Sequence, residues 1–189
     1  MTAILLTPPS GEPLTLSDAK AFLRVEHGDD DALISALIVA ARGQIEAQAR
    51  VALLTQTWRI VLDCWPADGR VRLRNGPLRA LSAARTFDAA GNAHMHDTAA
   101  FVLDGAAGIV SAPPFALPVP GRGRAGIELD VVLGFGDTAG DVPELLRHAV
   151  RTLVAHWYEN RAMAAIGQGV ALLPGSVSAM IASYRTVSL

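Results

Sequence analysis

The hydrophobic residues of this chain recur at a helical spacing near both ends and at a strand spacing in the middle. Over residues 143–161 the apolar side chains return every third or fourth position and fill one half of the helical circumference. The other half is mostly polar or charged and includes Arg147, Arg151, Tyr158, Glu159 and Arg161. We therefore predict a long amphipathic helix over residues 141–163, capped by Asp141 and with Pro143 in its first turn.

Shorter helical patterns flank this segment in the sequence. Thr15 and Asp18 form a capping box that predicts a helix to about Val25, and a second apolar stripe follows up to residue 50. We expect a helical hairpin over residues 14–50, with an acidic turn whose Asp29 or Asp30 caps the second helix. Residues 1–13 should form an extended arm that is ordered by a partner. Residues 174–189 predict a short helix capped by Ser176 and a tail, and residues 164–169 a hinge before it.

The middle of the chain changes to a strand pattern. Between residues 53 and 136, apolar and polar positions alternate in several runs, and turn residues such as Asp68-Gly69 separate the runs. Strands are expected over residues 54–62, 70–74, 78–87, 100–103 and 126–135, with an exposed hairpin loop around Gly91. The sequence thus predicts a single α+β domain over residues 1–189. In it, an N-terminal helical hairpin and a C-terminal long helix plus short helix pack with a β-rich middle region.

Charge and composition exclude several classes of protein. The chain has 189 residues, of which 51% are hydrophobic, and its 16 basic and 18 acidic residues give a formal net charge of −2. A protein that holds nucleic acid mainly through phosphates normally carries a basic face or a high isoelectric point. No apolar run approaches the length of a membrane span. We expect a soluble protein, made inside the cell, without a membrane partner.

Candidate chemistry is sparse. Cys64 is the only cysteine, so an internal disulfide and a multi-cysteine zinc site are excluded, and we expect it to be a buried small hydrophobic residue. His94 and His96 have a spacing that would put two imidazoles on one face of a strand, but no third or fourth zinc ligand is evident. No catalytic motif is recognisable. The sequence predicts neither an enzyme nor a bound cofactor.

Three arginines form the sharpest basic feature. Arg70, Arg72 and Arg74 alternate along one expected strand and share one of its faces. A solvated sheet face is the favoured interpretation. A face that binds phosphate or a partner is the alternative.

Several short motifs, taken in their order and spacing, resemble those of phage head-tail connector (adaptor) proteins, including the adaptors of phage-like gene transfer agents. They span residues 14–185 and comprise Leu14-Thr15-Leu16-Ser17-Asp18-Ala19-Lys20, Ala52-Leu53-Leu54-Thr55-Gln56-Thr57-Trp58, Gly134-Phe135-Gly136-Asp137 and Trp157-Tyr158-Glu159-Asn160-Arg161. The resemblance implies a homo-oligomeric ring, commonly of about twelve subunits. Such a ring lies in the particle neck between the portal protein and the stopper or tail-terminator protein. DNA would pass through its lumen without specific binding, and the subunit would be made in the host bacterial cytoplasm.

The surfaces expected to contact partners follow from this role. They are the N-terminal arm, the hairpin tip, the polar face of the long helix and the tail, which we expect to dock on the portal. The candidate contact residues are Arg70, Arg72, Arg74, Gly91, Arg147, Arg151, Tyr158, Glu159, Arg161, Tyr184, Arg185 and Leu189. Two rival functions stay open: a nucleic-acid-binding accessory protein that uses the three arginines, and a small metal-dependent enzyme that uses the two histidines.

Overall fold

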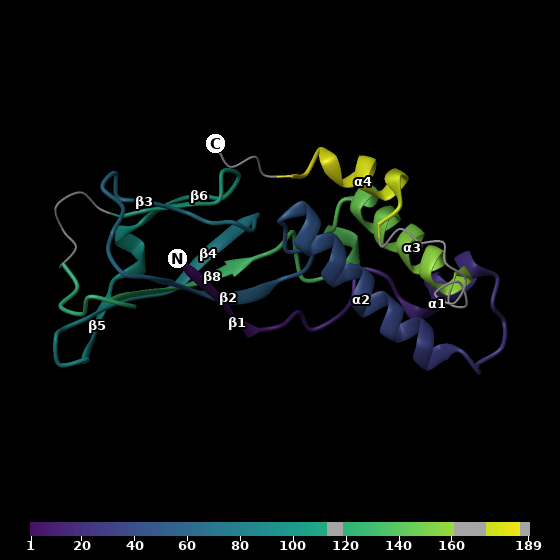
Figure 1. The fold of residues 1–189 in the computed structure, drawn as a ribbon, viewed down its shortest axis with the longest axis horizontal. Helices are drawn as coiled ribbons and strands as arrows, with labels where there is room; N and C mark the ends of the chain where they lie inside the picture. Colours follow the sequence, from purple (N-terminus) through teal and green to yellow (C-terminus); the bar gives the residue numbers. More distant parts are fainter. Residues whose placement is uncertain (113–118, 161–172, 186–189) are drawn as a thin grey trace, which may run out of the picture. The chain divides into compact units, whose positions relative to one another are not determined.

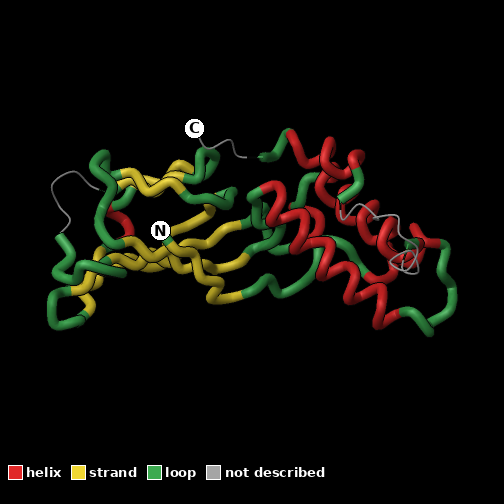
Figure 2. The backbone as a smooth tube through the Cα atoms, in the orientation of Figure 1, coloured by secondary structure: helices red, strands yellow, loops and turns green. Residues whose placement is uncertain are grey.

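The computed structural model describes residues 1–112, 119–160 and 173–185, and these residues form two compact units. Of the described residues, the first unit comprises 1–9, 55–112 and 119–134 and is built mainly of strands, and the second comprises 10–54, 135–160 and 173–185 and is built mainly of helices (Figures 1 and 2). Both kinds of element are therefore present, and the predicted α+β class is confirmed.

The described residues of the helical unit form four α-helices. They are α1 (Leu16–Leu23), α2 (Asp31–Ala49), α3 (Glu144–Glu159) and α4 (Gly175–Ala182). The capping box predicted for α1 is present, because the Thr15 hydroxyl accepts a hydrogen bond from the backbone N–H of Asp18 at 3.1 Å. The first two helices and α3 contact one another, so segments more than a hundred residues apart in the sequence share one core.

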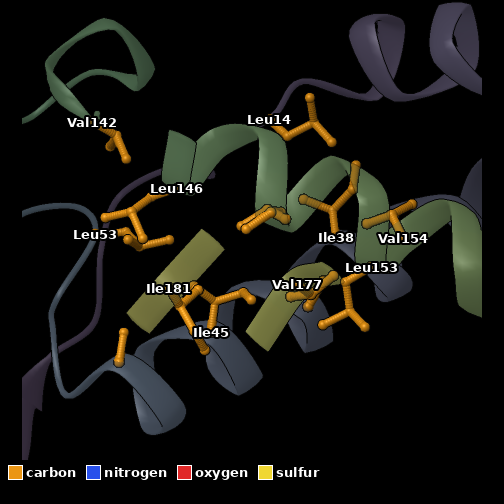
Figure 3. Close-up of a cluster of buried hydrophobic side chains, with 14 of the residues drawn as sticks. Leu14, Ile38, Ile45, Leu53, Val142, Leu146, Leu153, Val154, Val177 and Ile181 are labelled. Carbon is orange, nitrogen blue, oxygen red and sulfur yellow. The ribbon is translucent and has the colours of Figure 1, made fainter. Parts of the chain in front are cut away.

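The apolar stripe of α3 supplies much of that core. Its residues Leu146, Ala149, Val150, Leu153 and Val154 are all buried. Figure 3 shows Leu146 and Leu153 facing apolar side chains of the other helices, among them Ile38, Ile45, Val177 and Ile181. The helical period therefore predicted the buried face correctly, except at Leu145, which is 41% exposed.

Two predicted helix caps are wrong. Asp141 accepts hydrogen bonds from the backbone N–H and the hydroxyl of Thr138, both at 2.9 Å, and so closes a separate 3₁₀ turn, η2 (Ala139–Asp141). Pro143 then occupies the N-cap of α3. Ser176 lies inside the first turn of α4, because Pro174 holds an extended conformation directly before Gly175.

The described residues of the strand unit form two antiparallel sheets. The larger has the order β1-β2-β8-β4-β5, with bounds β1 (Thr2–Thr7), β2 (Gln56–Leu62), β8 (Ile127–Leu133), β4 (Leu78–Phe87) and β5 (Ala93–His96). The smaller has the order β3-β7-β6, with bounds β3 (Arg70–Arg72), β7 (Ile109–Ser111) and β6 (Val102–Asp104), and the 3₁₀ turn η1 (Thr98–Ala100) precedes β6. In Figure 1, β3 and β6 lie beside the larger sheet.

Alternation along the strands gives the larger sheet one apolar face. Leu129 and Val131 of β8 are fully buried on this face. In the smaller sheet, Val71 of β3 and Val110 of β7 are also fully buried. The backbone N–H of Leu78, at the start of β4, donates to the carbonyl of Gly105 between β6 and β7 at 3.2 Å. The two sheets of this unit are thus joined at that point.

Several expectations for this region need correction. Residues 2–7 are extended, as predicted, but they pair with β2 of the same chain and need no partner to form a strand. The strand that flanks the hairpin loop is β5, whereas the strand expected near residue 100 is β6 and belongs to the smaller sheet. Cys64 is exposed, because β2 already ends at Leu62.

The chain enters and leaves the strand unit at adjacent points of the helical unit. The backbone N–H of Phe135 donates to the carbonyl of Leu53 at 3.3 Å, and Leu54 forms a parallel bridge with Gly136. Residues 55–134 therefore connect two neighbouring segments of the helical unit.

Candidate functional site

The arginine face is present only in part, because the strand predicted over residues 70–74 ends at Arg72 and Arg74 lies beyond it. Arg70, Arg72 and Arg74 are exposed, while the two apolar residues between them are buried. A terminal nitrogen of Arg72 donates to Oδ2 of Asp68 at 2.8 Å. This hydrogen bond, with one from the backbone N–H of Arg70, lowers the pKa of Asp68. One of the three guanidinium groups is thus paired locally, which weakens the face as a phosphate site.

The hairpin tip is a well-defined exposed turn. Gly91 has φ of 89°, which favours glycine, and its backbone N–H donates to the carbonyl of Asp88 at 3.1 Å. The Asp88 carboxylate also accepts hydrogen bonds from the side chain and the backbone of Asn92, at 2.9 Å and 2.8 Å. These bonds lower the pKa of Asp88. The turn presents a fixed, anionic surface between β4 and β5.

The polar face of α3 is largely occupied by contacts within the helical unit. Glu144 pairs with Arg147 and lies 3.8 Å from Arg151, whose guanidinium is 5.8 Å from the ring centroid of Phe22. The Tyr158 hydroxyl donates to Asp30 at 2.5 Å and so ties α3 to the start of α2. Tyr158 therefore has a structural contact that the sequence did not predict.

Other predicted contact residues lie at the ends of the helices. Glu159 is exposed at the last turn of α3. Tyr184 packs edge-to-face on Phe135 with ring centroids 6.4 Å apart, and Arg185 donates to Gln48 at 3.5 Å. Arg161, Leu189 and the predicted hinge at residues 164–169 lie outside the described residues.

The two histidines do not form a metal centre with other ligands. His96 is hydrogen-bonded to the Thr86 hydroxyl at 2.9 Å, and burial followed by the proximity of His94 lowers its pKa. The nearest carboxylate oxygen to His94, from Asp88, is 3.7 Å away. Among the described residues, no group of three or more His, Cys, Asp or Glu side chains could hold a metal ion.

One surface that the sequence reasoning missed is the open edge of the larger sheet. All six residues of β1 are exposed, and Ile4, Leu5 and Leu6 are each more than two-fifths exposed. At the opposite edge, Met95 of β5 is 64% exposed. An uncharged run of β-prone residues is the sequence signal for such an edge, but the neighbours of a strand cannot be read from its own residues.

A second missed feature is a network of four charges on the face of the larger sheet opposite its apolar face. Arg59 of β2 and Arg85 of β4 both bind Asp130 of β8, with N–O distances of 2.7 Å and 2.5 Å. Both arginines also pair with Glu128, at 3.3 Å and 2.9 Å. Burial of the Asp130 carboxylate opposes its ionisation, but the two arginines outweigh this effect and lower its pKa.

This network has no net charge. Its two guanidinium groups and two carboxylates are already paired with one another, and the Asp130 side chain is only 9% exposed. A partner could cover this face without leaving an unpaired buried charge.

None of the helices described is long and apolar enough to cross a membrane.

Comparison with known proteins supports the resemblance seen in the motifs. Residues 13–72 match the model of the family described as phage gp6-like head-tail connector protein. No curated protein sequence matches the chain significantly.

Solved structures match over the whole chain. A chain in the neck of an empty gene transfer agent particle, computed with C6 symmetry, has a TM-score of 0.82 and 29% identity, with 100% of this chain and 97% of that chain covered. A chain from the virion of a native gene transfer agent particle gives the same values. A chain in the neck of a native particle, computed with C12 symmetry, has a TM-score of 0.80 and 28% identity at the same coverage.

These findings agree with one another. The family match covers the start of the helical unit and continues to β3, and the structural matches extend over both units. They confirm the resemblance to phage head-tail connector proteins and support the role of a structural neck protein in a virion or virion-like particle.

Proposed function

We propose that the chain is one subunit of a twelve-membered ring that joins the portal to the stopper or tail-terminator protein and gives passage to DNA. The observation that carries this proposal is the whole-chain match, at a TM-score of 0.80, to a neck chain from a particle computed with C12 symmetry.

The physical properties of the chain support this role. A ring with rotational symmetry needs two different, complementary surfaces on each subunit. A lumen that lets DNA slide must not hold its phosphates, and a formal net charge of −2 with locally paired arginines favours passage over binding.

Quantitative mass spectrometry of purified, DNA-filled particles tests the proposal. With twelve copies each of portal and connector, the molar ratio of this chain to the portal protein should be close to one. An abundant host protein measured in the same sample gives the level of carry-over. Absence of the chain above that level would overturn the proposal.

The tail is proposed to dock on the portal. Because Tyr184 packs on Phe135 and Arg185 contacts Gln48, the chain should be shortened after Arg185 so that these contacts stay. The shortened chain should unfold at the same temperature as the full chain, yet join heads to tails poorly. Normal yields of joined particles would contradict portal docking by the tail without affecting the ring itself.

A nucleic-acid-binding accessory protein is the alternative function. The exposure of Arg70, Arg72 and Arg74 along one side favours it, whereas the Asp68–Arg72 pair disfavours it. It predicts that the isolated chain binds duplex DNA with an affinity that falls steeply between 50 and 200 mM salt, by about a thousandfold or more for a protein with many phosphate contacts. Alanine at all three positions should then abolish binding. Undetectable binding by the unaltered chain at 50 mM salt would exclude this alternative.

A further inference from the structure

The larger sheet has two unpaired edges. No strand within the described residues pairs with the outer side of β1 or of β5. Neither strand contains the Lys, Pro or inward-pointing charge that commonly protects an edge from pairing. The irregularity between Leu5 and Thr7 leaves Thr2–Leu5 in a regular ladder with β2. Each edge thus offers backbone N–H and C=O groups to another chain.

The most exposed large apolar side chain of each edge strand, Ile4 of β1 and Met95 of β5, lies on the same face of the sheet. From one edge, Ile4 of β1 lies opposite Arg59 of β2, and Arg59 lies opposite Asp130 of β8. From the other edge, Met95 of β5 lies opposite Arg85 of β4, and Arg85 lies opposite Glu128 of β8. Asp130 and Glu128 are two residues apart in β8 and therefore share a face. Ile4 and Met95, 48% and 64% exposed, must flank the charge network on that same face.

The two edges also run in the same direction. Four successive antiparallel pairings connect β1 to β5 through β2, β8 and β4, so β1 and β5 are parallel to each other. If a second copy continued the sheet, its β1 would lie parallel to β5 of the first copy with the two apolar side chains on one face. Such a junction joins two different edges, as a cyclic assembly requires, and it can repeat from copy to copy.

We infer that neighbouring copies of this chain join by pairing the β1 edge of one copy with the β5 edge of the next. Ile4 and Met95 then cover each other beside the self-neutralised network of Arg59, Arg85, Glu128 and Asp130. The inference rests on the proposed ring, for which it supplies the contact between subunits. Isologous pairing of β1 with β1 is ruled out for such a ring, because it would close after two copies.

Cysteine cross-linking in purified particles tests the inference. The background variant is Cys64→Ser, because this exposed thiol would otherwise react. Ile4→Cys and Met95→Cys are introduced together, and each is also introduced alone. A short bismaleimide that spans direct and diagonal cross-strand neighbours is then added to the particles. Both positions are exposed, so thermal unfolding of the variants should match that of the background chain.

The expected result is a ladder of covalent multimers from the double variant and only monomers from each single variant. Dimers from Ile4→Cys alone would show that β1 meets β1 and would overturn the inference. Only monomers from the double variant, in particles that contain the chain at the ratio expected for a ring, would also overturn it while leaving the proposed function intact. Absence of the chain from the particles would overturn both.

Discussion

At the scale of single residues, the most consequential contacts join positions that are far apart in the chain. Arg59 and Asp130 are separated by 71 positions, and Tyr158 and Asp30 by 128. The capping box of Thr15 and Asp18 could be predicted, because both partners lie within one helical turn. Pairs between distant strands could not be predicted, because they depend on which strands become neighbours.

Asp130→Asn should destabilise the strand unit in a pH-dependent way. The pKa of Asp130 is lowered in the folded chain, so its stabilising effect is present above the unfolded pKa of about 3.9 and is lost as the pH falls through the folded value. We expect a loss of about 2 kcal/mol in unfolding free energy at pH 7, below the value for a fully buried pair because Arg59 is 28% exposed. Urea unfolding of the original chain and the variant at pH 7 and pH 3.5 measures this loss. If the loss in unfolding free energy were the same at both pH values, the lowered pKa of Asp130 would not be its cause.

At the scale of elements, the hydrophobic period of α3 predicted its buried face but not its start. The exception on that face, Leu145, provides a matched control. Leu153→Ala should lower the unfolding free energy by about 3 kcal/mol, because Leu153 is fully buried. Leu145→Ala should lower it by less than about 1 kcal/mol, since Leu145 is 41% exposed. Similar losses for both variants in urea unfolding would show that the first turn of α3 is covered by other parts of the chain.

The β1 edge gives a second prediction at this scale. Ile4→Lys places an edge-protecting charge on an exposed position and should leave the unfolding temperature within a few degrees of the original. Ring formation, followed by the mass of assembled complexes, should be strongly reduced. Leu33→Lys, at a comparably exposed apolar position on α2, is the control and should assemble normally. Equal loss of assembly in both variants would point to a general effect of charge.

The strands themselves were easier to predict than their order. The bounds of β4 are those expected from the alternation, and the loop around Gly91 is a hairpin turn. However, β8 lies between β2 and β4, although more than sixty residues separate it from β2 in the sequence. The exposure of Cys64 was missed for a related reason, since alternation does not determine the residue at which a strand ends.

At the scale of the whole molecule, the order and spacing of motifs carried more functional information than any single residue. Each motif is short, but together they span residues 14–185, and the matched solved structures cover the same range. The middle of the chain contributed least to the resemblance in sequence, yet it supplies the charge network and one of the two open edges, β5. Those surfaces arise from strand pairing, so they become visible only in three dimensions.

The hydrogen bond between Phe135 and Leu53 has a practical consequence for dissecting this protein. Because residues 55–134 start and end at neighbouring points of the helical unit, they are connected to it like an inserted domain. A variant chain without residues 1–9, in which a short Gly/Ser linker replaces residues 55–134, should therefore fold as an autonomous helical protein. Circular dichroism and cooperative thermal melting would verify this, and the truncated protein, which lacks β1 and β5, should stay monomeric.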